Sequence, residues 1–222
     1  NSLDEEQFWQ NIVQGNDLFS DVPMSHWVID DYYDPDPTAA DKTYCKRGGF
    51  LPDIDFDPLE FGIPPNILPV TDTVQLIALT IAKRVLQEAT NQQLDAANLD
   101  NTSVILGTTG TQELLVSMAA RLQRPIWVKA MREKGLPESR VQAICDRISE
   151  HYTPWQESTF PGLLGNVIAG RICNRFNLGG TNCVVDAACA SSLAAIHSAG
   201  NELELGKSDM VLKDGEDTMN DI

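Results

Sequence analysis

The sequence predicts an α/β layered fold, because strand-like and helix-like patterns alternate along it. Two short buried-strand patterns, TSVILGT at 102–108 and NCVVDA at 182–187, are each followed by a helical pattern. A third strand-like segment runs from Asp209 to Leu212. The 222 residues, 42% of them hydrophobic and 22% charged, have the composition of an ordinary globular protein and are long enough to bury a core.

The N-terminal part is predicted to hold one short helix and then an irregular segment. Apolar residues recur at helical spacing behind an acidic first turn, which predicts an amphipathic helix from Asp4 to about Gln14. From Asp17 to Pro69, repeated prolines exclude long helices, and many aromatic side chains offer points of anchorage. We interpret this segment as an ordered surface excursion.

The middle of the chain begins with a helix-capping signal at Thr71 and Asp72. It opens an apolar periodic run to about Ala89, which predicts a buried helix. The strand at 102–108 ends in a glycine-containing turn, and residues 111–121 are helical again. A strand, a turn and a helix in this order make half of a βαβ unit.

The second half of the chain is predicted to be mostly helical. Residues 125–157 have the pattern of two helical pieces broken at 135–137, and residues 160–176 that of a helix rich in small residues. After the strand pattern at 182–187, a helical run extends to about Leu205. The strand at Asp209 to Leu212 is followed by an acidic tail.

Charge narrows the classes of partner. The formal net charge of -16 argues against a nucleic-acid binder, because a phosphate backbone is held by clustered Lys and Arg. Residues 1–61 hold 14 acidic and three basic residues, whereas residues 121–147 hold seven basic and three acidic residues. The basic segment is open to two interpretations, a solvated helical face or a docking patch for an acidic partner.

No metal site is expected. The five cysteines form no CxxC pair, and with the three histidines they offer no zinc-like spacing. Asp53, Asp55 and Asp57 imitate the start of a calcium loop, but Pro58 stands where that loop needs Gly and Pro64 where it needs Glu. We therefore expect neither zinc nor calcium.

The expected location is the cytoplasm. The N-terminal residues NSLDEEQFWQ are acidic and lack the basic and apolar regions of a targeting signal. The longest apolar stretches are far shorter than the roughly 20 residues that a bilayer requires, so no membrane span is expected. An odd number of cysteines without a signal peptide indicates reduced thiols.

Cys189 is the candidate nucleophile. It stands where a buried strand pattern gives way to a helix, between small neighbours that leave room for a substrate. This position is typical of reactive thiols, because the partial positive charge of a helix N-terminus favours a thiolate and its N–H groups can bind an oxyanion. Position alone leaves open a buried structural cysteine.

The histidines offer no evident partner for this thiol. His197 lies eight residues further along the same helix, about 12 Å of rise from Cys189, and we expect it to be structural. His26 lies in the proline-rich segment and His151 in the helical pair. Either can approach Cys189 only through the fold.

Several segments resemble one known family. Val184 to Leu193, VVDAACASSL, resembles the active-site signature of the β-ketoacyl synthases, the condensing domains of fatty-acid and polyketide synthases. FPGLLGNVIAGRICNRFNL resembles the helix before that signature, NSLDEEQFWQNIVQG the region after the first strand, and ILGTTGTQELL the second strand and its turn. The segments DYYDPDPTAADKTYCKRGGFLPDIDFDPLEFGIPPNI and GLLGNVIAGRICNRFNLGGTNCVVDAACASS resemble synthases of polyunsaturated fatty-acid and glycolipid-type assembly lines.

The resemblance implies a thiolase-like layered fold, α-β-α-β-α in a complete domain, and a condensing acyltransferase. Cys189 would accept an acyl chain from the phosphopantetheine arm of an acyl carrier protein, with its backbone N–H as one oxyanion donor. A malonyl-carrier thioester would then decarboxylate and attack the acyl-Cys to give a β-ketoacyl product. No bound cofactor is implied, because the phosphopantetheine arrives on the carrier.

The resemblance also implies an incomplete domain. The family's two catalytic histidines lie in His-Gly-Thr and Asn-x-Gly-His type motifs well after the cysteine, and only 33 residues follow Cys189. The family's first strand would precede Asn1. We therefore expect residues 1–222 to be roughly the N-terminal half of a condensing domain, able as a fragment at most to be acylated.

Two further features come from the comparison with the family. The strand before the nucleophile, about Asn182 to Ala187, pairs with its twin across a two-fold axis in this family, which implies a homodimer for the complete domain. Where related chains run into a small Gly-Gly turn, this one has Lys213, Asp214, Gly215 and Glu216. Charge at a place expected to be packed leaves the local structure open.

Two alternatives to the condensing enzyme remain open. The chain can be a non-catalytic interaction module, in which Cys189 is merely packed and the basic segment docks an acyl carrier protein. It can also be a cysteine hydrolase with an elbow-type nucleophile, since small residues, Ala187 and Ser191, flank Cys189 at the required spacing. Such hydrolases need a histidine after the nucleophile, and only His197 follows.

Overall fold

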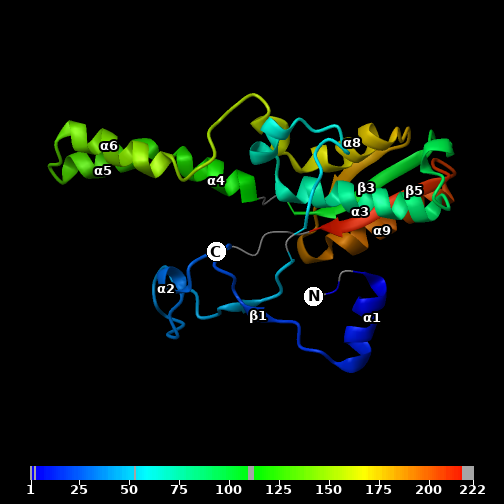
Figure 1. Ribbon diagram of the computed structural model, residues 1–222, viewed down its shortest axis with the longest axis horizontal. Coiled ribbons are helices and arrows are strands. Elements are labelled where there is room, and N and C mark those ends of the chain that lie inside the picture. Colours follow the sequence, from blue (N-terminus) through cyan, green and yellow to red (C-terminus); the bar gives the residue numbers. More distant parts are fainter. Residues whose placement is uncertain (1, 3, 53, 110–112, 217–222) are drawn as a thin grey trace. The chain divides into compact units, whose positions relative to one another are not determined.

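The computed structural model describes residues 2, 4–52, 54–109 and 113–216, and they form two compact units. The first unit contains the described residues up to Asp55, and the second begins at Phe56. Figure 1 shows the elements of both units coloured along the sequence.

The first unit begins with the expected helix. Helix α1 spans Glu5–Gln14, and its first turn is capped by the Asp4 carboxylate, which accepts a hydrogen bond of 2.8 Å from the Gln7 N–H. The remainder contains only short elements among its described residues: β1 (Ser20–Asp21) pairs antiparallel with β2 (Arg47–Gly48), and α2 spans Ile29–Tyr32. The irregular character predicted for this proline-rich segment is confirmed.

The second unit is built on a parallel sheet, as the alternation of strands and helices predicts. Strand β3 (Thr102–Thr108) lies in the centre, with β4 (Asn182–Val185) on one side and β5 (Met210–Glu216) on the other. Both neighbours run parallel to β3, so that Gly107 pairs with Val185 and with Gly215. All three strands therefore end at the same edge of the sheet.

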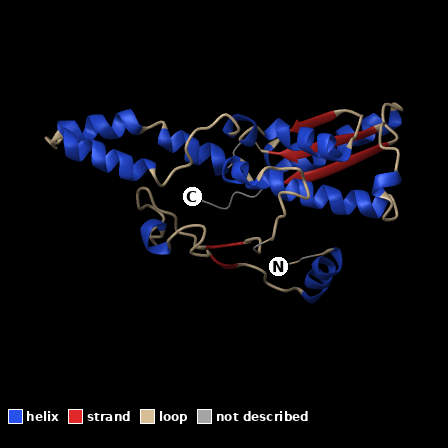
Figure 2. Ribbon diagram, turned by 45° about the horizontal axis from the view of Figure 1, so that its top comes forward, coloured by secondary structure: helices blue, strands red, loops and turns tan. Residues whose placement is uncertain are grey.

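Helices cover both faces of this sheet, as Figure 2 shows. Residues Val104 and Leu106 face α3 (Thr73–Ala89) and α8 (Gly165–Phe176) in the main core cluster. Ile105, between them, faces α9 (Ser191–Glu204) on the other side. This alternation is the period of two expected for a strand covered on both faces. The layered α/β prediction is confirmed.

Helix α3 begins where the capping signal predicts. Asp72 is the N-cap, and its buried carboxylate accepts hydrogen bonds from the Val74 N–H at 3.2 Å and from the Leu114 N–H at 2.9 Å. The 3₁₀ turn η1 (Pro65–Val70) leads into it, and the 3₁₀ turn η2 (Leu94–Ala96) follows it. The Asp72 side chain thus joins the start of α3 to the start of α4 (Glu113–Arg121).

The helix predicted over 160–176 is divided in the structure. A single turn, α7 (Thr159–Gly162), is followed by a break and then by α8. The buried Gln75 side chain occupies the break, where its Nε2 donates to the backbone carbonyls of Pro161, Gly162 and Leu164. These bonds satisfy the backbone carbonyls at the break, and the Gly162 carbonyl also accepts from the Asp72 N–H.

Two further boundaries differ from the sequence prediction. The helical pair expected over 125–157 is α5 (Arg124–Glu133) and α6 (Glu138–Ser149), which lie side by side in Figure 1, and residues 150–157 are not helical. The last strand does not stop at Leu212 but continues through Lys213, Asp214 and Gly215 to Glu216. The charged segment predicted as a tail is therefore part of the sheet, because β3 offers it a full row of backbone partners.

Candidate active site

Cys189 lies between the end of β4 and the start of α9, at the edge of the sheet where all three strands end. It occupies the middle of the 3₁₀ turn η3 (Ala188–Ala190), and α9 begins two residues later, at Ser191. Its side chain is exposed. In parallel α/β sheets, ligands bind beyond the carboxyl ends of the strands, which is the edge where this thiol is placed.

The turn that carries Cys189 is fixed by one buried hydroxyl. Ser191 Oγ donates to the Ala188 carbonyl at 2.7 Å and accepts from the Ala187 N–H at 2.9 Å. Asp186 adds a third bond, from the Ala188 N–H to its carboxylate at 3.1 Å. These bonds hold both flanks of the cysteine, so its position does not depend on its own side chain.

The backbone of the turn adopts an uncommon conformation. Ala188 has φ of 49°, in the left-handed region that residues with a Cβ atom avoid. A strained residue of this kind persists only where the surroundings determine it, and such residues cluster at functional sites. Here the determining contacts are those of Ser191 and Asp186.

Two glycines in the sheet let α9 approach this closely. A Cβ atom added to Gly107 would lie 2.5 Å from the carbonyl carbon of Ser191, and one added to Gly215 would collide with the Ser192 side chain. The first turn of α9 therefore lies directly over the ends of β3 and β5. The sequence pattern places Gly107 at the turn that ends the strand, whereas it lies inside β3, where a glycine marks a close approach of another backbone.

Several free N–H groups were expected around the thiol, and this expectation is partly wrong. The amides of Ala188, Ala190 and Ser191 all donate within the turn. The Cys189 N–H donates to no acceptor among the described residues. One backbone donor at the cysteine itself thus remains for an oxyanion.

The other thiols differ from Cys189 in environment. Cys145 and Cys173 are buried, and burial raises the pKa of the Cys173 thiol to about 11. Burial, with the nearby Glu202 carboxylate, also raises the pKa of Cys183. Cys45 is exposed like Cys189, but it lies in the first unit, and its Sγ donates to the Arg47 carbonyl.

The structure brings no histidine to the thiol within its described contacts. His197 lies on the exposed side of α9 and is within 3.3 Å of the Asn201 amide. His151 follows α6 in the turn, where its N–H donates to the Ile148 carbonyl, and His26 contacts the Phe50 ring in the first unit. The geometry of a cysteine hydrolase is therefore not assembled among the described residues.

Most of the charge of the basic segment at 121–147 is paired internally. Arg124 pairs with Asp146 at 2.7 Å, and Arg132 forms a two-pronged pair with Glu138. Further members are engaged as follows: Arg147 with Glu150, Lys129 with Glu133, and Arg121 with the carbonyls of Ser149 and Tyr152. Lys134 and Arg140, beside the α5–α6 turn, form no ion pair with a described residue.

A metal site was not expected, and the described residues contain no group of three or more metal-ligating side chains. Asp53 of the calcium-like pattern lies outside the described residues, as does Thr111 at the start of the helix predicted over 111–121. Among the described residues, no helix combines the length and the apolar character needed to cross a membrane.

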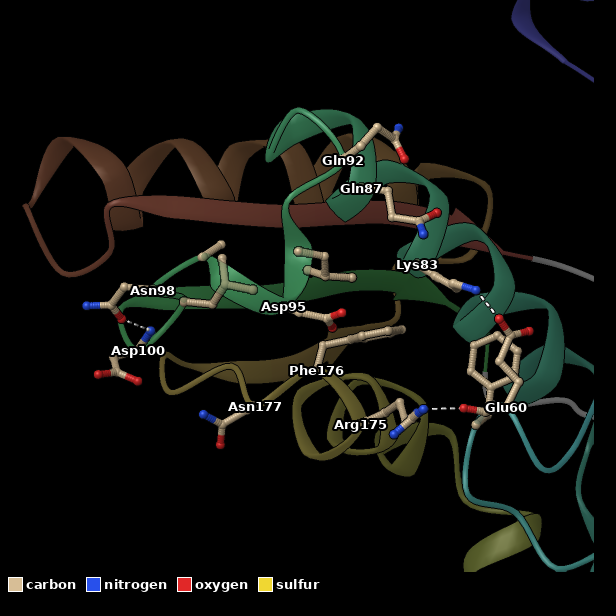
Figure 3. A pocket seen from close by; sticks show the side chains of 14 residues that line it. Glu60, Lys83, Gln87, Gln92, Asp95, Asn98, Asp100, Arg175, Phe176 and Asn177 are labelled. Atoms are coloured by element: carbon tan, nitrogen blue, oxygen red, sulfur yellow. Dashed lines mark hydrogen bonds and ion pairs between the residues drawn. The ribbon is translucent and has the colours of Figure 1, made fainter.

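A cavity lies at the opposite edge of the sheet from Cys189. Figure 3 shows this hollow of about 580 Å³ between α3, the end of α8 and the segment before β3. Its charged groups are largely satisfied, since Lys83 pairs with the Glu60 carboxylate and Arg175 donates to the Glu60 carbonyl. The amino ends of parallel strands are not the usual edge for a catalytic site. Cys189 remains the candidate.

Nearly the whole chain matches a family of known proteins. The family model described as "Beta-ketoacyl synthase, N-terminal domain" matches residues 1–221. One of the subunits of a polyunsaturated fatty acid synthase from Thraustochytrium sp. is 40% identical over 216 residues, which are 96% of this chain and 8% of that protein. A PKS-NRPS hybrid synthetase of Aspergillus candidus is 31% identical over 93% of this chain and 7% of its own length.

Solved structures give the same result. An oxazolomycin ketosynthase domain from Streptomyces albus superposes with a TM-score of 0.71 at 26% identity, over 95% of this chain and 31% of that one. The ketosynthase from module 6 of the bacillaene synthase of Bacillus subtilis has a TM-score of 0.61 at 25% identity, over 93% of this chain and 28% of that one. The thiolase-like fold implied by the sequence is confirmed. The chain spans less than a tenth of the length of these curated relatives.

Proposed function

Because the chain belongs to the β-ketoacyl synthase family, we propose that Cys189 is the acyl-accepting nucleophile of a condensing domain in fatty-acid or polyketide chain elongation. The observation that carries this proposal is the placement of the thiol. It is exposed at the carboxyl edge of the sheet, in a turn fixed from both sides, with its own N–H uncommitted among the described residues.

In the proposed first step, the Cys189 sulfur attacks the thioester carbonyl of an acyl chain carried on phosphopantetheine. A carbon–sulfur bond forms at Cys189, and the bond to the pantetheine sulfur breaks, so that the pantetheine leaves as a thiolate and takes up a proton. In this step the Cys189 N–H donates to the oxyanion of the proposed tetrahedral intermediate. Small neighbours on both sides leave the sulfur open to a long thioester arm.

The proposed second step is condensation. A malonyl-carrier thioester loses CO₂, and the resulting carbanion attacks the acyl carbonyl on Cys189, which releases the cysteine thiolate and a β-ketoacyl-carrier thioester. This step needs donors that stabilise the carbanion and its oxyanion. Because none of the three histidines contacts Cys189 among the described residues, we propose that the 222-residue chain accepts an acyl group but does not complete the condensation.

We propose that residues 1–222 correspond to the nucleophile-bearing part of a condensing domain. Three observations support this. The matching family model is that of an N-terminal domain, and the chain covers about a third of the solved ketosynthase chain. On α9, the side facing away from the sheet exposes large apolar residues such as Leu193 and Ile196, as expected of a helix that another layer covers in a complete domain.

The proposed partner is an acyl carrier protein, whose phosphopantetheine supplies the thioester, and the proposed docking surface is the end of the α5–α6 pair. Lys134 and Arg140 are exposed there without ion-pair partners among the described residues, so they can meet an acidic surface without losing an internal pair. The same surface would serve the alternative function, a non-catalytic module that binds a carrier protein without being acylated.

A homodimer is proposed for the complete domain. Strand β4 pairs with β3 on one side, and the described sheet leaves its other side unpaired. Such an edge offers backbone N–H and C=O groups to a second strand. Analytical ultracentrifugation of the complete domain tests this, and a monomer at micromolar concentration would contradict it.

Acylation is tested by exposing the chain to a short acyl-pantetheine thioester and measuring its intact mass. We expect one acyl group per chain, retained in Cys45→Ala and absent in Cys189→Ala. A Cys189→Ala protein that is acylated like the wild type would refute the assignment. Circular dichroism of both variants verifies that they fold alike.

Docking is tested by titrating an acyl carrier protein against Lys134→Glu and Arg140→Glu, with Lys207→Glu as the control on a different surface. We expect each of the first two to weaken binding by roughly three- to tenfold at low salt, because surface charge pairs contribute modestly and are screened. Equal binding by all three variants would contradict the docking surface while leaving the acylation proposal intact.

A further inference from the structure

Two acidic side chains point toward an apolar face at the end of β5. Side chains alternate along a strand, so Asp214 and Glu216 face the same side as Leu212, which packs with α3 and α8. Gly215 faces the other side, where it meets Ser192 of α9. The two acids therefore lie at positions where the pattern of a covered strand calls for apolar residues.

The surroundings of the pair offer little that can neutralise it. Asp214 and Glu216 line a cavity of about 80 Å³ whose walls are mainly aliphatic side chains of α3, with Leu106 of β3 and Ile172 of α8. Among the described residues that line it, Lys213 is the one basic group, and its side chain is exposed. Across β5, α9 presents the Ser192 side chain. Among the described residues, no hydrogen-bond donor reaches the buried Oε2 atom of Glu216.

The two carboxyl groups hydrogen-bond each other, which requires a proton between them because two carboxylates offer only acceptors. Burial raises the pKa of both groups. The charge of Asp214 and its hydrogen bond raise that of Glu216 further, to about 8. Glu216 is thus the protonated group of the pair, and its carboxyl O–H donates a hydrogen bond to the Asp214 carboxylate.

We propose that Asp214 and Glu216 share one proton, which allows the end of β5 to stay packed against α3. Loss of this proton leaves two buried carboxylates, so the end of the strand separates from α3. The closed strand keeps Gly215 against Ser192, three residues after Cys189. Release therefore removes one of the two sheet supports under the first turn of α9. The pair of carboxyl groups acts as a pH-sensitive switch beside the turn that carries Cys189. This switch does not depend on whether Cys189 is acylated.

The sign of the effect follows from the two pKa values of Glu216. In the released strand end, the carboxyl group has its ordinary pKa of 4.5, whereas in the closed form the pKa is about 8. Between these values, only the released form loses its proton. Rising pH therefore favours release across this window, by up to about tenfold per pH unit, and has no further effect above it.

Amide hydrogen exchange of β5 measures the switch directly. We expect the protection of residues 212–216, corrected for intrinsic exchange rates, to fall at least about tenfold between pH 5 and pH 8 in the wild type. In Glu216→Gln, whose side-chain amide is a neutral donor at every pH, the protection of these residues should stay the same between pH 5 and pH 8. Asp209→Asn, which removes an exposed carboxylate just before the strand, should behave like the wild type. A level wild-type profile, or an equal fall in Glu216→Gln, would overturn the proposal.

A second measurement needs no variant. The carboxyl ¹³C resonance of Glu216 should titrate with a midpoint near 8 in the folded wild-type chain. A midpoint near the ordinary value of 4.5 would show that no proton is held in the pair and would overturn the proposal.

Discussion

The backbone of Ser191 lies directly on Gly107. A Cβ atom at position 107 would approach the Ser191 carbonyl carbon to 2.5 Å and the Ser192 nitrogen to 2.7 Å, and neither backbone atom can rotate away. The first turn of α9 is thereby seated over the end of the central strand. This contact sets the depth at which the turn with Cys189 lies.

Replacing Gly107 by alanine should displace α9. We expect Gly107→Ala to lower the free energy of unfolding by about 1–3 kcal/mol, because overpacking against backbone is relieved only by moving the helix. Urea denaturation measures this loss. The rate at which iodoacetamide labels Cys189 should also change, because the displaced helix follows the turn that carries this thiol.

The matched control is Gly200→Ala on α9, where an added Cβ would meet no atom within 4 Å. This substitution should stabilise the chain by about 0.5–1 kcal/mol, because alanine is a better helix former than glycine. Equal stability changes in the two variants would contradict the close approach at Gly107.

The Ser191 hydroxyl should be required for the shape of the turn. Ser191→Ala removes the bonds to the Ala188 carbonyl and from the Ala187 N–H, so we expect a loss of about 1–2 kcal/mol in the free energy of unfolding. Ser198→Ala, whose hydroxyl bonds only within α9, should cost under about 0.5 kcal/mol. Thermal unfolding of both variants distinguishes a turn held by Ser191 from one held by the strand alone.

The five thiols should react with iodoacetamide in an order set by their environments. Cys189 should be modified first, with Cys45 next, because both are exposed and only Cys189 lies at the start of a long helix. Cys173 should resist labelling up to pH 9, because burial raises its pKa to about 11. Peptide mapping by mass spectrometry gives the order, and labelling of Cys189 no faster than Cys183 would support a merely structural thiol.

The α5–α6 pair should lose stability in acid. The two bonds from Arg132, and a third from Gln142, lower the pKa of Glu138 from 4.5 to about 2. A lowered pKa means that the stabilisation is present above pH 4.5 and is lost as pH falls toward 2. Glu138→Gln should therefore unfold at a lower temperature than the wild type at pH 6, and the difference should shrink by pH 2. A pH-independent difference would show that the ion pair adds nothing.

The elements with strong local signals could be predicted from the sequence. The capping residue Asp72, the β-branched run at 102–108 and the acidic first turn of α1 all specify their elements through nearby residues. The position of Cys189 at a strand-to-helix turn followed from the same local patterns.

The differences from the sequence predictions arise from contacts distant in sequence. The break before α8 is occupied by the side chain of Gln75, which lies 86 residues or more from the carbonyls it binds. The continuation of β5 to Glu216 depends on pairing with β3, which overrides the unfavourable strand propensity of Asp214 and Gly215. The contact of α9 with Gly107 likewise joins residues that are more than 80 positions apart in the sequence.

The most direct measurement for the central claim is a time course of acylation resolved by peptide. The wild-type chain is incubated with a labelled acyl-pantetheine thioester, digested, and analysed by mass spectrometry for label at Cys189 and at Cys45, the two exposed thiols. We expect Cys189 to be acylated at least about tenfold faster than Cys45, because only Cys189 combines exposure with an oriented turn and a backbone donor. Equal labelling of the two thiols, or label on Cys45 alone, would contradict the assignment of Cys189 as the acyl acceptor.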